Sequence, residues 1–426
     1  MTFTMQEPGG STALLGGPGT TLTADQVDRF VAEQLGRYDL DGRSLCVLVP
    51  DATRSCPVPL LLGAVHAAVH GRVSRLVVVV ALGTHAAMTA DELSRHLGYA
   101  ENGLEVTYPG TSVHNHEWWD DQTFALLGRI EAERVAELSG GLLERGVDVR
   151  VNRAVVENDV TLVVGPVFPH EVVGFSGGNK YFFPGVAAQE LTDLTHWLGA
   201  LITSQEIIGT QGTTPVRALI DEAASLIPTQ TLALCVVVES STNQLHAASF
   251  GEPRAAWSAA AGVSAQTHVQ YLDAPVRRVL SIIPPKYPDI WTAAKGFYKV
   301  EPVVADGGEV ILYAPHIRQI AAMHPEIDEI GYHCRDFFVK QWDRYEHLHW
   351  GVLAHSTHLR GAGQYDEASG ERLRVTVTLA TGIPEAVVRQ ANLSYLDPAD
   401  VDVAAFEAEP GTLVLPQAGE VLFRLR

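Results

Sequence analysis

The chain has 426 residues, of which 46% are hydrophobic and 8% aromatic, so it is long enough to build two cores and two domains. Its formal net charge of −20 repels nucleic-acid phosphates and anionic lipid headgroups, so we expect neither a nucleic acid nor a membrane as a partner. The sequence has no signal peptide pattern and no long apolar span, and its four cysteines are scattered. These features predict a cytoplasmic protein with free thiols.

The first half of the sequence alternates apolar strands with capped helices. Residues 9–20, rich in glycine, serine and threonine, predict a loop, and residues 22–36 predict a helix with Thr23 as its N-cap. Three apolar runs predict strands that end in polar residues: "SLCVLVPDATR", "RLVVVVALGTH" and "VTLVVGPVFPHE". Helices are predicted at "GAVHAAVHG" and at "TADELSRHLG", which Thr89 caps. This alternation is typical of a parallel, doubly wound sheet.

A second group of elements follows the third strand. "AAQELTDLTHWLGALI" predicts a helix that carries His196, and "RRVLSIIPPKYPDIWTAAKGF" predicts a strand, a turn and a helix with Trp291 and Lys295. "GGEVILYAPH", "LRVTVTLATGIP" and "GTLVLPQAGEVLF" predict further strands. We therefore predict an α/β protein of two domains, each a mainly parallel sheet with flanking helices. Their bounds are residues 1–270 and 271–400, and residues 401–426 are left open to a return to the first domain.

The polar ends of the three predicted strands supply candidate catalytic groups. Ligands of open α/β sheets bind beyond the carboxyl ends of the strands. That rule gathers one acid, one arginine and two histidines from Asp51-Ala52-Thr53-Arg54, Gly83-Thr84-His85 and His170-Glu171. A strand-end salt bridge between Asp51 and Arg54 is the alternative interpretation of that pair.

The segment "GFSGGNKYFFPGVA", residues 174–187, sets a lone lysine, Lys180, between glycines and aromatics. It is not a phosphate-binding P-loop, because Asn179 separates the glycines from the lysine and Tyr181 replaces the hydroxyl that would hold magnesium. A lysine in a turn that points at water is the simpler alternative.

Together, D-x-T-R, G-T-H, P-H-E and G-G-x-K-x-x-x-P-G resemble the nickel-pincer lactate racemase family. In that family one histidine lies ten residues before the cofactor lysine and another sixteen after it, and His170, Lys180 and His196 keep both intervals. The resemblance implies a 2-hydroxy-acid racemase or epimerase that works by proton-coupled hydride transfer, with its active site in a cleft between the two domains. A side chain cannot accept hydride, so an organometallic acceptor suits this reaction.

The resemblance also implies a role for each matching residue. The cofactor is pyridinium-3,5-bisthiocarboxylic acid mononucleotide with nickel, a nickel-pincer nucleotide that maturation enzymes supply. Lys180 would hold it covalently and His196 would ligate the nickel, while His85 and His170 would be the paired general acid and base. The remaining expected contacts are to the cofactor, from Asp51, Thr53, Gly177 and Gly178, and to the substrate, from Arg54, Lys295, Trp291 and Thr292. For Lys295, a solvated helix lysine is the alternative.

Two departures from the family pattern affect the expected substrate. Ala86 stands where the family has an arginine, and Trp291-Thr292 replaces a Tyr-Gln pair, so we expect a lactate-like or somewhat larger 2-hydroxy acid. The rival functions are a non-catalytic cofactor or carboxylate binding protein, a nicotinamide oxidoreductase, which lacks its G-x-G-x-x-G here, and a zinc hydrolase. "HNHEWWDD" at 114–121 predicts a surface loop, and no role is assigned to His347, His349, His355 and His358.

Overall fold

The fold is that of a computed structural model, which describes residues 12–240 and 242–426. The chain divides into two compact units. Unit 1 contains the chain up to Phe168 together with Phe175–Thr192 and Gln211–Thr267, and unit 2 contains Pro169–Gly174, Asp193–Thr210 and His268–Arg426. The chain therefore passes from one unit to the other five times, after residues 168, 174, 192, 210 and 267.

Unit 1 is built on a seven-stranded sheet in the order β1-β11-β10-β7-β2-β3-β4. All neighbouring strands are parallel except the pairs that β11 makes with β1 and β10, which confirms the predicted mainly parallel sheet. The strands are β1 (Ala13–Gly16), β2 (Ser44–Pro50), β3 (Arg75–Ala81), β4 (Thr111–Asn115), β7 (Val160–Pro166), β10 (Gln230–Val238) and β11 (Leu245–Gly251), with a separate hairpin of β5 (Phe124–Ile130) and β6 (Val147–Asn152).

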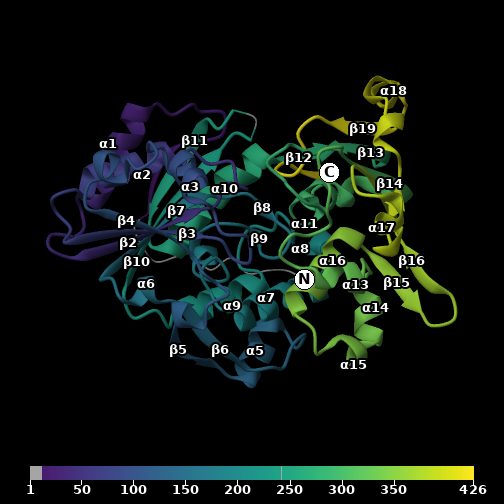
Figure 1. The fold of residues 1–426 in the computed structure, drawn as a ribbon, viewed down its shortest axis with the longest axis horizontal. Helices are drawn as coiled ribbons and strands as arrows, with labels where there is room; N and C mark the ends of the chain where they lie inside the picture. Colours follow the sequence, from purple (N-terminus) through teal and green to yellow (C-terminus); the bar gives the residue numbers. More distant parts are fainter. Residues whose placement is uncertain (1–11, 241) are drawn as a thin grey trace. The chain divides into compact units, whose positions relative to one another are not determined.

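Capping residues define the predicted helices of unit 1. Thr23 and Thr89 each form a capping box, so the helices that they begin are confirmed. The helices are α1 (Ala24–Leu35), α2 (Val58–Val69), α3 (Ala90–Leu97), α4 (Leu104–Thr107), α5 (Ala132–Ser139), α6 (Arg153–Val156), α9 (Pro215–Ala224) and α10 (Pro253–His268), with 3₁₀ turns η1 (Asp121–Thr123) and η2 (Gly178–Tyr181). Figure 1 shows α1, α2 and α3 on one side of the sheet and α9 on the other.

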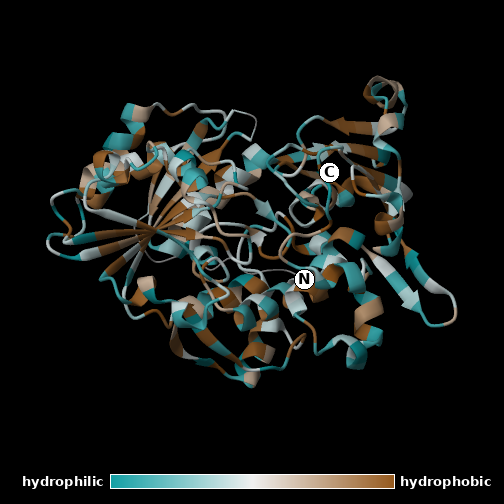
Figure 2. Cartoon of the chain, in the orientation of Figure 1, coloured by the Kyte–Doolittle hydropathy of each residue, from teal (hydrophilic) through white to brown (hydrophobic). Residues whose placement is uncertain are grey.

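The two faces of the strands differ in what they cover. One residue in two along β2, β3, β7 and β10 joins a core with α1, α2 and α3, as Val47, Val78 and Leu162 do. Figure 2 shows these strands as strongly hydrophobic along their length, which is typical of a sheet covered on both faces. The opposite face of β7 carries Gly165, paired with Cys235 of β10. That face supports the loop with Lys180, since a Cβ on Gly165 would lie 1.7 Å from the hydroxyl of Tyr181.

Unit 2 has a five-stranded parallel sheet in the order β18-β17-β14-β13-β19. Its strands are β13 (Val276–Ile282), β14 (Val304–Ala314), β17 (Val375–Thr381), β18 (Ser394–Tyr395) and β19 (Thr412–Leu415), and β12 (Val269–Leu272) pairs with β20 (Leu422–Leu425), β15 (Gly363–Asp366) with β16 (Gly370–Leu373), and β8 (Pro169–His170) with β9 (Gly174–Phe175). The main helices are α7 (Gln189–Ile202, which begins in unit 1), α8 (Ser204–Ile207), α11 (Ile290–Ala293), α12 (Lys295–Tyr298), α14 (Arg335–Lys340), α16 (Trp350–Arg360), α17 (Glu385–Gln390) and α18 (Val403–Ala408).

The structure corrects several local expectations. In the described part of residues 9–20, Ala13–Gly16 forms an edge strand against β11, while residues 9–11 lie outside the described residues. Residues 401–426 pair within unit 2, through β19 with β13 and β20 with β12, and do not return to the first domain. The predicted helix with Trp291 and Lys295 is two short helices, α11 and α12, separated at Ala294.

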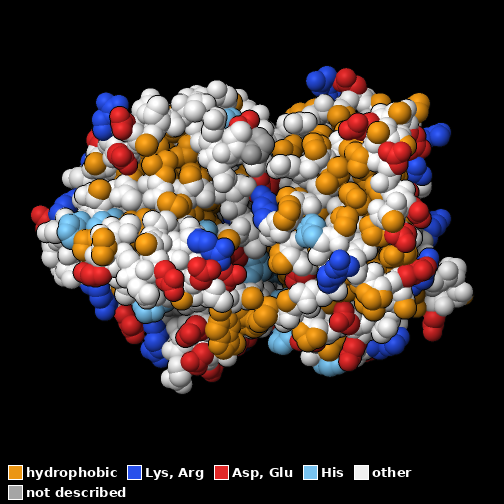
Figure 3. Space-filling model, turned by 45° about the horizontal axis from the view of Figure 1, so that its top comes forward, with side chains coloured by type: hydrophobic (Ala, Val, Ile, Leu, Met, Phe, Trp, Pro, Cys, Tyr) orange, Lys and Arg blue, Asp and Glu red, His pale blue; other side chains and the backbone are white. Residues whose placement is uncertain are grey.

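The surface is mixed in character. Figure 3 shows acidic, basic and apolar side chains interspersed on the face drawn. Among the residues that the structure describes, no helix combines the length and the apolar character that a membrane crossing requires.

Candidate active site

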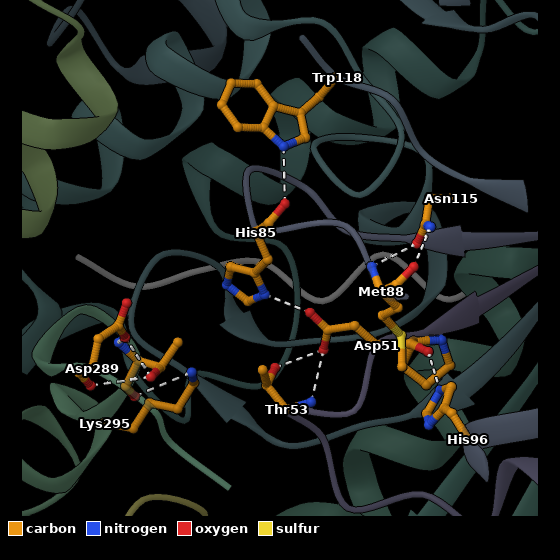
Figure 4. Close-up of polar contacts among 11 residues, drawn as sticks. Asp51, Thr53, His85, Met88, His96, Asn115, Trp118, Asp289 and Lys295 are labelled. Carbon is orange, nitrogen blue, oxygen red and sulfur yellow. Dashed lines mark hydrogen bonds and ion pairs between the residues drawn. The ribbon is translucent and has the colours of Figure 1, made fainter. Parts of the chain in front are cut away.

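The ends of β2 and β3 place an acid against a histidine. Because these strands are parallel neighbours, their carboxyl ends share one edge of the sheet, where Asp51 follows β2 and His85 follows β3. Nδ1 of His85 lies 2.5 Å from Oδ2 of Asp51 (Figure 4). Oδ1 of Asp51 accepts hydrogen bonds from the backbone N–H and the hydroxyl of Thr53, at 3.0 and 2.6 Å. If His85 donates Nδ1–H to the carboxylate, Nε2 is left as the nitrogen that exchanges a proton.

Nearby charges keep Asp51 ionised although it is buried. Burial alone would raise the pKa of Asp51, but His85, Thr53 and Arg54 outweigh it and hold that pKa well below its usual range. Arg54 also acts on Tyr181. Burial raises the pKa of the Tyr181 hydroxyl well above its ordinary value, and the charge of Arg54 offsets part of that rise. Arg54 thus lies among the groups that surround Asp51 and the lysine loop in unit 1.

A buried arginine holds the backbone of the lysine loop. Arg217 of α9 is 1% exposed, and its guanidinium donates to the carbonyls of Gly177 (3.1 Å) and Phe175 (2.5 Å). The guanidinium carbon also lies 4.1 Å from the ring centroid of Trp257. One turn further along α9, Asp221 accepts a hydrogen bond from the side chain of Asn179 at 2.9 Å. These contacts fix the residues directly before Lys180, which is itself half-buried.

The two glycines of the loop pack closely against Val167 and against α10. Gly177 and Gly178 have φ angles of +89° and +60°. A Cβ on Gly177 would lie 2.7 Å from Val167, and one on Gly178 would lie 2.7 Å from Cβ of Trp257. Positive φ and this tight packing both favour glycine at the two positions.

The far end of the loop is tied to the loop that carries His85. Gly185 donates its N–H to the carbonyl of Lys180 (3.1 Å), and its own carbonyl accepts a hydrogen bond from the N–H of Gly83 (2.9 Å). Beyond it, the ring of His116 contacts the carbonyl of Ala187 at 3.3 Å. His116 has no exposed surface, so the predicted surface loop at 114–121 is wrong for this residue, and burial lowers its pKa to about 4.

In unit 2, His170 is buried at the end of β8. The backbone N–H of Val172 donates to Nδ1 of His170 at 3.2 Å, so the neutral ring carries its proton on Nε2. Oε2 of Glu171 lies 3.3 Å from the same Nδ1 and acts on the ring through its charge, because that nitrogen already accepts a hydrogen bond. Lys299, 3% exposed, anchors the strand by donating to the carbonyls of Pro169 and Glu420.

His196 belongs to a group of histidines within unit 2. The pKa of His355 is lowered well below its ordinary value, mainly by burial and then by the charges of its neighbours His358, His324, Lys295 and His196. The ring of Trp291 stacks between His324 and His355, with centroid distances of 4.0 and 3.8 Å. Sequence reasoning left His355 and His358 unassigned and overlooked His324. The spacing of three residues between His355 and His358 on one helix was the available signal.

Lys295 is a buried lysine and not a solvated helix residue. It is 6% exposed, donates to the carbonyl of Thr292 at 3.3 Å, and has its ammonium 4.9 Å from the ring centroid of Tyr287. The hydroxyl of Thr292 lies 2.7 Å from Oδ1 of Asp289, which caps α11 (Figure 4). That hydroxyl is therefore already engaged within the protein.

The predicted site residues thus fall into two sets. Unit 1 contains Asp51, Thr53, Arg54, His85, Gly177, Gly178 and Lys180, and unit 2 contains His170, His196, Trp291, Thr292 and Lys295. Sequence reasoning missed Arg217, because a buried arginine that binds backbone has no motif. Within the described ranges, no three His, Cys, Asp or Glu side chains converge as a metal site of their own.

Comparisons with known proteins show what part of the chain is similar to lactate racemases. Residues 31–209 match the family described as the lactate racemase N-terminal domain. A lactate racemase from Thermoanaerobacterium thermosaccharolyticum is 24% identical over 301 residues, which are 68% of this chain and 65% of that protein. Residues 31–209 are thus similar to the N-terminal domain of lactate racemases.

Solved structures of similar fold extend the likeness along the chain. A protein from Thermotoga maritima, known as a crystal structure, is 31% identical with a TM-score of 0.88, and the match covers 97% of this chain and all of the other. The lactate racemase apoprotein from Thermoanaerobacterium thermosaccharolyticum matches with a TM-score of 0.69 at 18% identity, again over 97% of this chain. The second likeness concerns the fold alone.

Proposed function

We propose that this protein is a member of the lactate racemase family and acts as a racemase or epimerase of a 2-hydroxy acid. It would be an isomerase that uses a lysine-tethered nickel-pincer nucleotide. The observation that carries the proposal is the 2.5 Å contact between His85 and Asp51 at the end of the sheet, in the same unit as the clamped loop of Lys180. A carboxylate on one ring nitrogen fixes the tautomer and orientation of a general base.

The hydrogen bonds of the two histidines suit opposite tasks. Nδ1 of His85 faces a carboxylate, so a neutral ring has a lone pair on Nε2 and can take a proton. Nδ1 of His170 accepts the N–H of Val172, so a neutral ring has its proton on Nε2 and can give one. A racemase needs one group that removes the hydroxyl proton and one that returns a proton to the product. We assign these tasks to His85 and His170, with the order reversed for the opposite enantiomer.

The side chains present fit the proposed cofactor. Lys180 supplies a half-buried amine on a loop that Arg217 holds in place, as a covalent tether requires. His196 supplies an imidazole nitrogen, a good ligand for nickel. The bound group would accept and return the hydride that no side chain can carry. We keep the cofactor contacts predicted for Asp51, Thr53, Gly177 and Gly178. In the structure Asp51 contacts His85 and Thr53.

The substrate carboxylate is assigned to Arg54 and Lys295. Arginine pairs with carboxylates through two parallel N–H groups, and a buried lysine binds a single oxygen strongly. Trp291 would line the pocket, while Thr292 would contribute through its backbone since its hydroxyl already contacts Asp289. A lactate-like or somewhat larger 2-hydroxy acid is the proposed ligand. Maturation enzymes as partners and a cytoplasmic location belong to the same proposal, and four buried, unpaired cysteines suit a reducing compartment.

The test is an intact mass of the protein co-expressed with pincer-maturation enzymes, with nickel measured on the same samples. We expect an adduct of nucleotide size with near-stoichiometric nickel, both lost in Lys180→Ala. The matched control is Lys340→Ala, which replaces an exposed lysine paired with Asp336. An unmodified mass without nickel, from a maturation system that loads a known racemase, would refute the proposal.

Single replacement of the two bases separates an enzyme from a cofactor carrier. In chiral chromatography of 2-hydroxy acids, His85→Gln and His170→Gln should each abolish interconversion while the adduct and nickel remain. A carrier would show no interconversion in the unchanged protein.

A further inference from the structure

Unit 2 contains a cavity of about 480 Å³ that takes no part in the proposed reaction. Its walls come from the end of α7 and from α8, from the turn after α16, and from Arg335 and Arg424. The lining includes the polar residues Thr203, Ser204, Gln205 and Thr357. All of these residues belong to unit 2, so the cavity is complete within it.

Two arginines, Arg335 and Arg424, line this cavity. Each is half-buried and donates one guanidinium N–H to a backbone carbonyl. Arg335 donates to the carbonyl of Leu201 at 2.8 Å, and Arg424 donates to the carbonyl of Ile208. Neither forms an ion pair with any carboxylate in the part of the chain that is described. Both retain further N–H groups, since a guanidinium has five. Two half-buried arginines that form no direct ion pair can each bind an anion through these remaining N–H groups.

Two acids, Glu206 and Glu301, also line the cavity, but neither forms an ion pair with Arg335 or Arg424 among the described residues. Glu301 is 1% exposed and accepts the N–H of Ala362 at 2.8 Å, and its remaining cationic neighbour is Arg374 at 3.7 Å. Glu206 is exposed at the surface. The cavity is larger than a single inorganic anion needs and offers two guanidinium groups. We propose that it binds a small dicarboxylate, one carboxylate on Arg335 and the other on Arg424, with hydroxyls such as those of Ser204 and Thr357 on the wall.

Ser204 links this cavity to the histidines of unit 2. Its hydroxyl lies 2.5 Å from Nδ1 of His358, which is 4% exposed. Nε2 of His358 has no hydrogen-bond partner among the described residues, and the charges that act on this ring come from Glu171 and His196. A ligand that bonds to Ser204 competes with His358 for the hydroxyl. The dicarboxylate would therefore regulate the reaction. This regulatory role rests on the proposed function, whereas the binding site itself does not depend on it.

Calorimetry of the full chain, produced without the maturation enzymes, tests the site with succinate as the probe. Succinate has no hydroxyl, so the proposed racemase reaction cannot consume it. We expect Arg335→Gln and Arg424→Gln each to bind at least about tenfold more weakly, because each loses a charged hydrogen bond. Arg344→Gln, which replaces an exposed arginine, and Lys295→Ala, which alters the proposed substrate site, should bind like the unchanged protein. Ala362→Leu fills the cavity and leaves both arginines in place, so it should also block binding.

Three results would overturn the proposal. The first is no succinate binding by the unchanged protein at about 10 mM, far above the concentration that a specific site needs. The second is binding that Lys295→Ala abolishes and Ala362→Leu spares, which would place succinate at the substrate site. The third is equal affinity for inorganic phosphate, which would show a general anion site. Racemisation by loaded enzyme should change with succinate in the unchanged protein and not in Ala362→Leu. If the unchanged protein binds succinate and Ala362→Leu does not, but the racemisation rate of the unchanged protein does not respond to succinate, the regulatory role is wrong.

Discussion

Replacement of Arg217 by methionine should destabilise unit 1 and loosen the loop that holds Lys180. The side chain makes two charge-assisted hydrogen bonds, to Gly177 at 3.1 Å and to Phe175 at 2.5 Å, and each is worth about 1.5–3 kcal/mol. Burial opposes this gain by lowering the pKa of Arg217 to about 10. Removal also takes away the larger of the two cationic charges that act on the buried Asp221, whereas Arg254 stays 3.7 Å from its carboxylate. From the two lost hydrogen bonds we expect the free energy of unfolding by urea to fall by about 3 kcal/mol or more.

A second variant separates the effect of the Asp221 charge from the loss of the contacts that Arg217 makes. Asp221→Asn keeps an oxygen that accepts the amide of Asn179 but removes the negative charge. The double variant Arg217→Met with Asp221→Asn should therefore be more stable than Arg217→Met by at least about 1 kcal/mol. The control Arg134→Met removes an arginine of α5 that pairs with Glu222 of α9, and it should change stability little. A loss below about 1 kcal/mol in Arg217→Met would refute the idea that this arginine holds the loop.

Three further predictions concern other parts of unit 1. Asp51→Asn should lower kcat of the loaded enzyme by about 10²-fold with little change in KM, because His85 loses the carboxylate that orients it, whereas unaltered kcat would mean that Asp51 has no such role. The pKa of His116 falls from about 6.5 in the unfolded chain to about 4 in the fold, so the unfolded chain binds more protons between these values and about 2 kcal/mol of stability is lost from pH 7 to pH 5. His116→Gln should flatten that part of the urea-derived stability curve and the exposed His114→Gln should not; equal curves for both would contradict the assignment. Gly178→Ala should destabilise the protein by more than Gly42→Ala in thermal melts, because both glycines have positive φ but only Gly178 lacks space for a Cβ, and equal losses would leave backbone strain as the sole cause.

Local chemistry made much of the first sheet predictable. Continuous apolar runs that end in polar residues located β2, β3 and β7, and Thr23 and Thr89 located two helix starts. Buried strands and helix caps could be recognised because each depends on a few neighbouring residues in the sequence. The contact between Asp51 and His85 followed from one rule, that parallel strands place their carboxyl ends together.

Features that depend on distant parts of the chain were not predictable from such windows. Arg217 looks like any helix arginine, and its burial depends on Trp257 and on carbonyls about 40 residues earlier in the sequence. His116 lies in a polar stretch, and only the return of the chain at Ala187 buries it. The membership of residues 401–426 in unit 2 depends on pairing with β12 and β13, more than 130 residues away.

The five passages of the chain between the units limit how this protein can be divided. A fragment ending at residue 267 would contain Pro169–Gly174 and Asp193–Thr210 without the rest of unit 2. The carbonyls of Pro169, Leu201 and Ile208 would lose the buried or half-buried cations that now bind them, which come from Lys299, Arg335 and Arg424. Neither unit is a contiguous stretch that a single recombination event could transplant into another gene. Changes of specificity in such a chain have to arise by substitution within an intact molecule, because domain exchange would need a cut at every passage.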